Sequence, residues 1–505
     1  MEPIQLLRHY IAMTKLRTTF KTILLTSTLI TMAACSTNQA TGRSQFTGLM
    51  PASSEASIGA QEHEKIIAEY GGVIKNQSLQ NYVTSVGRKI VPNTERQDVQ
   101  YTFTLLDSPV VNAFALPGGY VYVTRGILTL ANSEAELAAV MAHEIGHVTA
   151  RHSAERYSTS ILTGLGATIA SAAIGSQGVG QALGLGANLY LSSYSRSQEH
   201  EADDLGVRYL SKTGYDPIAM AGFLKSLEAS SKLDAAEAGS EGGNDAPSYF
   251  STHPVTSQRI SQSTSEAGKY TGGKNKINRI EYMKAINGMT VGDSASQGFV
   301  IDNTFVHTDL GFAFDIPNNY KTQNSAQAFI AQSKSSNGGT VIFNGASKSP
   351  SQSIDNFLRQ NVLKGDMAGA RDFGTNTVNG IKTASVEKTG TVNGVKSNIR
   401  IIAYEWDADT VYQFTIAMPE RIGASELSEL QRSGLSLKRL SSSEKTKYRP
   451  KKMSFRVASS GDSVQSYAKR FPYNDGLNEM RFRTINGMSP TEQVRSNQAY
   501  KVITQ

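Results

Sequence analysis

Apolar side chains recur every three or four positions between residues 134 and 149, which is the spacing of a helix with one buried face. Ser133 stands three residues before Glu136, just ahead of this run. A serine and a glutamate at that spacing form a capping box, so the pattern predicts that a helix begins here. The predicted core face of this helix consists of Leu137, Val140, Met141, Ile145 and Val148.

The pattern changes along the remaining chain and predicts an α+β multidomain protein, because 505 residues are too many for one core. Residues 56–285 carry helical patterns around one β-hairpin. Residues 296–440 alternate short strand patterns with helical ones, which indicates a second, α+β domain without a motif that assigns its role. The stretch 441–452 is polar and basic, as is typical of a linker. Residues 453–505 form a small terminal module.

The N-terminal segment, residues 1–35, has the pattern of an export signal. Basic residues precede an apolar run, TILLTSTLITMAA, that ends at the single cysteine of the chain, Cys35. The run is shorter than the ~20 residues that a membrane-spanning helix needs. The residues before Cys35 resemble a bacterial lipobox, which predicts lipidation of this cysteine; the alternative is an ordinary signal with a chance cysteine. A start at Met13 gives a more typical signal length than a start at Met1.

The residues that follow Cys35, STNQATGRSQFTG, are small, polar and turn-rich. This composition predicts a flexible tether over residues 36–55, which would let a folded domain stand off the membrane. Ser36, rather than aspartate, follows the cysteine, and this resembles the outer-membrane address of lipoproteins in Gram-negative bacteria. We therefore expect an exported, periplasmic protein that is lipid-anchored to the outer membrane.

Residues 161–191 are almost all small and apolar, and two interpretations apply to them. Their length permits a membrane-spanning helix. Repeated glycines, together with Ser176 and Gln177 near the centre, favour a buried helical hairpin with a glycine break.

Two histidines and a glutamate in HEIGH have the spacing of a metal site. His143 and His147 are four residues apart on the predicted helix, so both side chains project from the same face. Glu144 is turned about 100° from His143, where it can act on a water at the metal without being a ligand. The chain has only 8 histidines, so this arrangement seldom arises by chance. The spacing favours a metal site over two solvated histidines on an amphipathic helix.

A third ligand is expected in EHEADD, which begins at Glu199. A metzincin site would need histidine at position 153 and glycine at position 150, where this chain has serine and alanine. Glu199 and Asp203 are four residues apart on a predicted helix, whereas Glu201 points about 200° away from Glu199. We expect Glu199 as the third ligand and Asp203 as its supporting neighbour, with Glu201 as the alternative ligand. Two imidazoles and one carboxylate leave a position for water, as in catalytic zinc sites.

HEIGH, the E-x-x-A-D of EHEAD and GVRYLSKTGYDPIAM together resemble the gluzincin metallopeptidases of family M48, in the soluble periplasmic branch. The resemblance covers about residues 36–285 and implies a mainly helical zinc peptidase domain with a small β-sheet. It implies one zinc ion per chain. By the resemblance, the zinc ligands are His143, His147 and Glu199. Glu144 is the general base, and Asp203 is the supporting residue.

Two further motifs add residues to this scheme. STHPVTSQRI resembles the closing motif of the family, whose histidine approaches the zinc as an extra, regulatory ligand; here it is His253. His253 or Tyr194 is a candidate donor to the oxyanion, and His152 is expected to be structural. VNAFALPGGYVYVTRGIL resembles the strand, turn and strand before the zinc helix. It implies an edge strand that binds the substrate backbone, with the residues Asn112, Ala113 and Phe114.

The terminal module, residues 453–505, resembles a LysM-like domain. MSFRVASSGDSVQSYAKRF, RFRTINGM and NQAYKVI supply a strand, G-D-S-V, a short helix, an asparagine-glycine step and a final strand. The segment before RTINGM is longer than in a typical LysM, and the glycine before the last strand is replaced. The resemblance implies binding to peptidoglycan; the alternative is a packing domain without a ligand.

The family resemblance implies a zinc endopeptidase that acts on unfolded, misfolded or misassembled cell-envelope proteins, in protein quality control. Two other functions stay open: a chaperone or assembly factor for outer-membrane proteins with restrained proteolysis, and a peptidoglycan-binding envelope protein. Glu144 favours the enzyme, because a scaffold does not need a general base. The formal net charge is +7, and its basic residues gather mainly at the N-terminus and near residue 450, so no nucleic-acid partner is expected.

Overall fold

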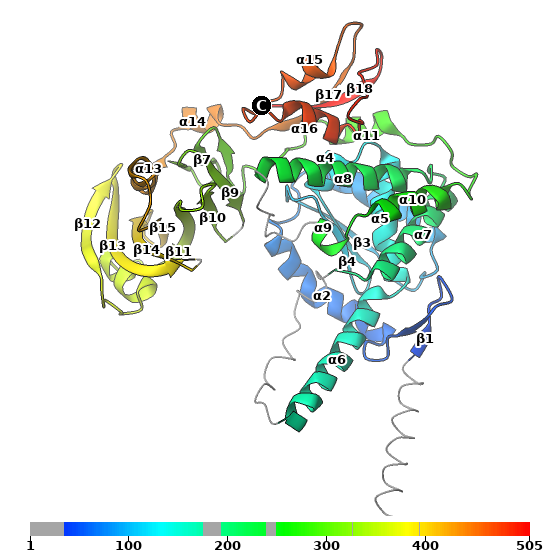
Figure 1. Ribbon diagram of the computed structural model, residues 1–505, viewed down its shortest axis with the longest axis horizontal. Helices are drawn as coiled ribbons and strands as arrows, with labels where there is room; N and C mark the ends of the chain where they lie inside the picture. Colours follow the sequence, from blue (N-terminus) through cyan, green and yellow to red (C-terminus); the bar gives the residue numbers. More distant parts are fainter. Residues whose placement is uncertain (1–34, 175–192, 239–248, 326, 393) are drawn as a thin grey trace, which may run out of the picture.

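A computed structural model describes residues 35–174, 193–238, 249–325, 327–392 and 394–505. The predicted signal, up to residue 34, lies outside the described residues. Figure 1 shows a mainly helical body beside a second body built on a curved sheet. The two bodies have separate apolar cores, which agrees with the predicted α+β multidomain organisation.

The segment that follows Cys35 is folded against the helical body. Its elements are β1 (Cys35–Thr37), β2 (Ser44–Phe46) and α2 (Ala52–Glu69), with β1 and β2 paired antiparallel. Asn38, Gln45 and Met50 are each no more than 3% exposed. The predicted tether over residues 36–55 is therefore wrong. Small polar residues suit a linker, but here their side chains find hydrogen-bond partners inside the fold.

The helical body surrounds a small mixed sheet with the strand order β3-β5-β4. These strands are β3 (Thr102–Leu106), β4 (Ala113–Leu116) and β5 (Tyr120–Thr124). β4 and β5 form the predicted hairpin, and its turn uses Gly118 and Gly119 at positive φ. β3 runs parallel to β5 and was not predicted, since an alternation over five residues is too short to stand out.

Helices make up the rest of this body. They are α3 (Gln77–Ile90), the 3-10 turn η1 (Val91–Asn93), α4 (Arg125–Leu130), α5 (Glu134–Thr149), α6 (His152–Ile174), α7 (Arg196–Thr213), α8 (Ala219–Ala238), α9 (Tyr249–Thr252), α10 (Ser257–Ala267) and α11 (Arg279–Ile286).

The predicted helix start at Ser133 is confirmed, with one difference. The Ser133 side chain accepts a hydrogen bond from the backbone N–H of Glu136 at 3.1 Å. The Glu136 carboxylate does not return to Ser133 but accepts from the N–H of Asn132 at 2.8 Å. One capping partner therefore lies a residue earlier than a capping box requires. α5 is buried along nearly its whole length, and this fixes the site that it carries.

Two glycines allow α5 and α7 to pack closely. A Cβ on Gly146 would lie 3.1 Å from the carbonyl oxygen of Ala202, and a Cβ on Gly206 would lie 3.3 Å from the backbone nitrogen of His143. α7 begins with a capping box between Ser195 and Gln198 and ends at Gly214 in the left-handed conformation. The close contact sets the acidic residues of α7 against the histidines of α5.

α6 runs away from the helical body on the same side as β1 (Figure 1). It forms a single helix as far as Ile174, and its first turns include Leu162, which is 50% exposed. The remainder of the predicted hairpin over residues 161–191 lies outside the described residues. Among the described helices, none is both long and apolar enough to cross a membrane.

The second body is built from residues 299–439, in the region where the sequence pattern predicts an α+β domain. In the described part of the chain, its larger sheet is antiparallel with the order β12-β13-β14-β15-β11-β10-β9, and the smaller has the order β16-β8-β7-β6. The strands are β6 (Phe299–Ile301), β7 (Thr304–His307), β8 (Phe312–Asp315), β9 (Tyr320–Asn324), β10 (Phe329–Ser333), β11 (Thr340–Ser347), β12 (Arg371–Val378), β13 (Ile381–Val392), β14 (Val395–Glu405), β15 (Thr410–Pro419) and β16 (Lys438–Arg439). The helices are α12 (Ile354–Phe357), the π-turn η3 (Leu358–Val362) and α13 (Ala424–Gly434).

The C-terminal module shares its core with the helical body. Its elements are β17 (Lys452–Val457), α15 (Val464–Ala468), α16 (Asn478–Ile485) and β18 (Ala499–Thr504); α14 (Ser442–Lys447) lies within the predicted linker. Phe482 and Tyr500 belong to the same apolar cluster as the interior of α5. Lys501 is fully buried, and its ammonium donates to the carbonyl oxygens at the end of α4. The module is therefore not a freely hinged domain.

Candidate metal centre

Four buried donor residues from three parts of the chain converge beside α5. α5 supplies His143 and His147, α7 supplies Glu199, and His253 follows α9. Their possible ligand atoms all lie within 4.8 Å of one another, and each side chain is no more than 2% exposed. The residues predicted as ligands from the sequence are thus brought together, with the predicted regulatory histidine among them.

The separations of these donors are close to those between the ligands of a zinc ion, with a different oxygen of Glu199 nearest to each histidine. His143 Nε2 lies 3.1 Å from His147 Nε2 and 3.6 Å from Glu199 Oε2, and His147 Nε2 lies 3.5 Å from Glu199 Oε1. A tetrahedron with metal–ligand bonds of 2.0–2.1 Å has edges of about 3.3 Å. Neutral imidazoles and an ionised carboxylate are also the ligand types that zinc prefers.

Asp203 and Arg259 hold two of these ligands from behind. Asp203 Oδ1 lies 2.9 Å from His143 Nδ1, so the outer nitrogen of that imidazole has a carboxylate partner. Arg259 donates to both oxygens of Asp203, at 2.7 and 2.8 Å, and its third nitrogen lies 2.6 Å from Glu199 Oε2. Arg259 was missed as a site residue, although it is the arginine of the STHPVTSQRI motif.

The charges at the site call for a cation. The buried, ionised carboxylates of Glu199 and Asp203 contact the guanidinium of Arg259 and together carry one more charge than it does. Burial alone would raise the pKa of Glu199, but His253, His147 and Arg259 hold it well below its usual value. Burial lowers the pKa of His147 and keeps it neutral, the form that binds metal. A divalent ion would balance the remaining negative charge.

Glu144 lies at this cluster but is not part of the donor set. It is fully buried, and neither of its carboxylate oxygens has a hydrogen-bond partner among the described residues. Its Oε1 lies 3.6 Å from His253 Nε2. Burial, with the nearby Glu199 and Asp203 carboxylates, raises the pKa of Glu144 to about 8 although the charge of His143 opposes this. A buried carboxylate that accepts no hydrogen bond from the described residues and has a pKa near neutrality suits the role of a general base.

Two tyrosines pack on the donor histidines. Tyr194 stacks on His147 with ring centroids 3.7 Å apart, and its hydroxyl lies 3.2 Å from Ser153 Oγ. Tyr249 stacks on His253 with ring centroids 4.5 Å apart. Both tyrosines are buried. The sequence suggests Tyr194 only as an oxyanion donor, whereas in the structure its ring covers one face of His147, a predicted ligand.

The predicted substrate strand lies at the edge of its sheet and is covered. Asn112, Ala113 and Phe114 are each no more than 2% exposed. Just before them, the carbonyl oxygen of Val111 accepts a hydrogen bond from the N–H of Tyr249 at 2.9 Å. The segment that carries His253 is therefore hydrogen-bonded to the chain just ahead of the predicted substrate strand.

Glu201, the alternative ligand, lies outside the donor cluster. Its carboxylate is 3.2 Å from Nε2 of His152, on the side of His147 away from the other donors. This follows from the helical phase of α7, which turns Glu201 away from Glu199.

The site therefore has the donors of a mononuclear catalytic zinc centre with two histidines and one glutamate. Comparison with known proteins assigns the chain more narrowly. The sequence pattern of Peptidase family M48 matches residues 77–267. Metalloprotease LoiP of Escherichia coli is 30% identical over 187 residues, which are 36% of this chain and 69% of LoiP. The chain belongs to peptidase family M48, as the sequence predicted.

Two longer relatives match the same region. The beta-barrel assembly-enhancing protease of Yersinia pestis is 31% identical over 207 residues, which are 39% of this chain and 40% of that protein. The mitochondrial metalloendopeptidase OMA1 of Schizosaccharomyces pombe is 32% identical over 208 residues, which are 41% of this chain and 59% of OMA1. The chain thus spans about two fifths of the length of the assembly-enhancing protease.

Proposed function

We propose that this chain is a zinc-dependent endopeptidase that hydrolyses peptide bonds of misfolded or misassembled proteins of the bacterial cell envelope. The observation that carries the proposal is the buried carboxylate of Glu144, which accepts no hydrogen bond from the described residues, beside the clustered His143, His147 and Glu199. Relatives named as a beta-barrel assembly-enhancing protease and as metalloproteases support the activity and the class of substrate.

His143, His147 and Glu199 would hold the zinc. When bound, zinc polarises the scissile carbonyl and lowers the pKa of water. Glu144 takes the proton from the attacking water and passes it to the leaving amine. Asp203 and Arg259 keep the imidazole of His143 and the carboxylate of Glu199 oriented. The buried position of all these groups excludes bulk water from the proton transfer.

His253 restrains this peptidase. Its Nδ1 lies 3.3 Å from His143 Nε2 and 2.8 Å from Glu199 Oε1, so it would compete with water for a bound metal. The hydrogen bond from Tyr249 to Val111 also holds residues 249–253 beside the start of the predicted substrate strand. Substrate hydrolysis then requires displacement of residues 249–253. This supports restrained proteolysis, as expected of a factor that also assists protein assembly.

We place the enzyme in the periplasm, anchored to the outer membrane through a lipidated Cys35. The signal-like N-terminus, the lipobox and Ser36 support this location. A LysM-like fold of the terminal module would add a contact with peptidoglycan. We expect the full chain to bind purified peptidoglycan and to lose this binding when exposed residues of the C-terminal module are changed. This measurement tests the proposed contact with peptidoglycan.

The peptidase proposal is tested with Glu144→Gln. We expect this variant to be folded and to bind one zinc per chain, while its hydrolysis of casein falls by about 10²–10⁴-fold. Removal of the metal by a chelator should abolish casein hydrolysis by the parent, and His253→Ala should hydrolyse casein faster than the parent. Undiminished hydrolysis by Glu144→Gln with its zinc bound would refute the proposal.

A further inference from the structure

In each metal-binding imidazole, the ring nitrogen that faces away from the other donors needs a hydrogen-bond partner. The two histidines of α5 have different partners. Asp203 serves His143 directly. His147 Nδ1 instead lies 2.8 Å from Nδ1 of His152, a side chain that is 0% exposed. His152 Nε2 in turn lies 3.2 Å from Glu201 Oε2. A chain of three groups therefore runs outward from His147.

Only one arrangement of protons satisfies this chain with neutral imidazoles. The Glu201 carboxylate can only accept, so His152 donates to it from Nε2. The Nδ1 of His152 then carries a lone pair and accepts from the Nδ1–H of His147. This leaves the lone pair of His147 on Nε2, the atom that faces the other metal donors. The chain thus fixes His147 in the tautomer that can bind a metal.

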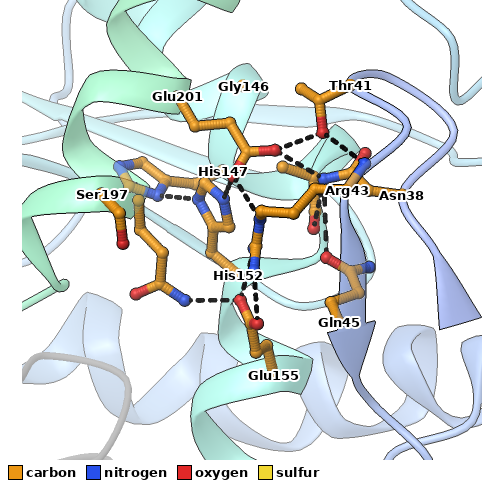
Figure 2. Close-up of polar contacts among 12 residues, drawn as sticks. Asn38, Thr41, Arg43, Gln45, Gly146, His147, His152, Glu155, Ser197 and Glu201 are labelled. Atoms are coloured by element: carbon orange, nitrogen blue, oxygen red, sulfur yellow. Dashed lines mark hydrogen bonds and ion pairs between the residues drawn. The ribbon is translucent and has the colours of Figure 1, made fainter. Parts of the chain in front are cut away.

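The hairpin of β1 and β2 holds the outer end of this chain. Asn38 donates to Glu201 Oε1 at 3.0 Å, Thr41 also donates to Oε1, and Arg43 donates to Oε2 at 2.9 Å. Figure 2 shows Glu201 between the hairpin and His152. Three donors that converge on one carboxylate keep it in the accepting state and fix its position.

Arg43 also ties the hairpin to α6. Its two terminal nitrogens donate to both oxygens of Glu155, at 2.8 and 2.7 Å, and Gln198 of α7 donates to the same carboxylate at 2.8 Å. The hairpin is thereby anchored beside α6, which begins at His152, and beside α7 (Figure 2). Its position is determined by several bonds and not by the contact with Glu201 alone.

We propose that His152 and Glu201 are positioning residues for His147, and that the hairpin, through Asn38, Thr41 and Arg43, completes the metal centre from outside. The proposal rests on the proposed metal-dependent function. It makes the segment next to Cys35 a working part of the peptidase.

The proposal is tested by the zinc affinity of the full chain, measured by competition with a chelating dye. We expect His152→Leu to raise the zinc dissociation constant by about 10–100-fold, the usual effect of removing the partner of a metal-binding histidine. His152→Asn should recover most of the affinity, because its side-chain oxygen lies near the position of Nδ1. Equal affinity of His152→Leu and the parent, or no recovery in His152→Asn, would overturn the proposal.

Two controls separate positioning from general stability. Glu95→Gln removes a different carboxylate, which pairs with Arg208 of α7, and should leave the zinc affinity unchanged. The melting temperature of each metal-free variant shows whether folding is altered. A loss of zinc affinity that merely follows a lower melting temperature, or that also appears in Glu95→Gln, would overturn the proposal.

A double variant tests the part played by the hairpin. Arg43→Met should weaken zinc binding less than His152→Leu, and the combined variant should be no weaker than His152→Leu, because the hairpin acts through His152. Additive losses would refute that route.

Casein hydrolysis by the parent protein is measured separately. A parent that binds zinc but cleaves no casein refutes the proposed function alone, and a parent that binds no zinc refutes both proposals.

Discussion

Glu199 and Glu201 stand two residues apart on α7, and their surroundings differ because the helix turns them to opposite sides. Glu199 faces the donor cluster and lies 2.6 Å from Arg259. Glu201 faces away and accepts from the N-terminal hairpin. The phase of a carboxylate on the helix therefore decides whether it faces the donor cluster or the residues behind it.

At this scale we predict that Glu199→Gln loses zinc. The amide is a poor ligand and cannot balance the charge of Arg259, so the zinc dissociation constant should rise by more than the ~100-fold that marks the upper range for supporting residues. Metal content after dialysis measures this. Glu201→Gln should still hold one zinc per chain when zinc is saturating; the reverse result would show that the two glutamates were assigned the wrong way round.

At the scale of elements, the first residue of α5 fastens this helix to its neighbours. The Glu134 carboxylate accepts from Tyr215 at 2.5 Å, Tyr82 at 2.9 Å and Lys89 at 3.0 Å. It is 4% exposed. Burial would raise the pKa of Glu134, but these hydrogen bonds lower it below its usual value. The ionised form therefore stabilises the packing that positions His143 and Glu144.

We predict that Glu134→Gln lowers the free energy of unfolding of the metal-free protein by roughly 1–3 kcal/mol near neutral pH. Because the pKa is lower in the folded state, this stability is present above the unfolded pKa of about 4.3 and is lost as the pH falls through the folded value. The difference between parent and variant should shrink in acid. Urea unfolding at several pH values measures it, and a difference that grows in acid would contradict the prediction.

On the scale of the whole molecule, the division of the chain into apolar cores differs from the division into segments that the sequence pattern predicts. The terminal module shares one apolar cluster with the helical body, while the sheet of the second body has its own. Residues far apart in the sequence thus unfold together when they share a core.

We therefore predict two thermal transitions that respond to different substitutions. Phe482 and Phe414 are both 0% exposed, in the first and the second core respectively. Phe482→Ala should destabilise the transition that includes the peptidase by about 3–5 kcal/mol, and Phe414→Ala should affect only the other. Calorimetry with a parallel peptidase assay measures this. If Phe482→Ala unfolds only the C-terminal module and leaves the transition temperature of the peptidase unchanged, the two do not share a core.

The sequence by itself determined the zinc helix, its start at Ser133, the pairing of His143 with His147, and the family. These features depend on residues within one or two helical turns, so their geometry follows from the helix. It also predicted the separate α+β domain, whose strands have clear alternation. The same local reasoning selected Glu199 and Asp203, which lie one turn apart.

Only the tertiary structure decided what surrounds that helix. The hairpin after Cys35 has the composition of a tether, yet its polar side chains meet Glu201 across the fold. Arg259, His152 and the hydrogen bond from Tyr249 likewise depend on contacts between distant segments. Composition and periodicity report which residues can be buried or hydrogen-bonded, but the partner is chosen by packing, and packing is a property of the whole chain.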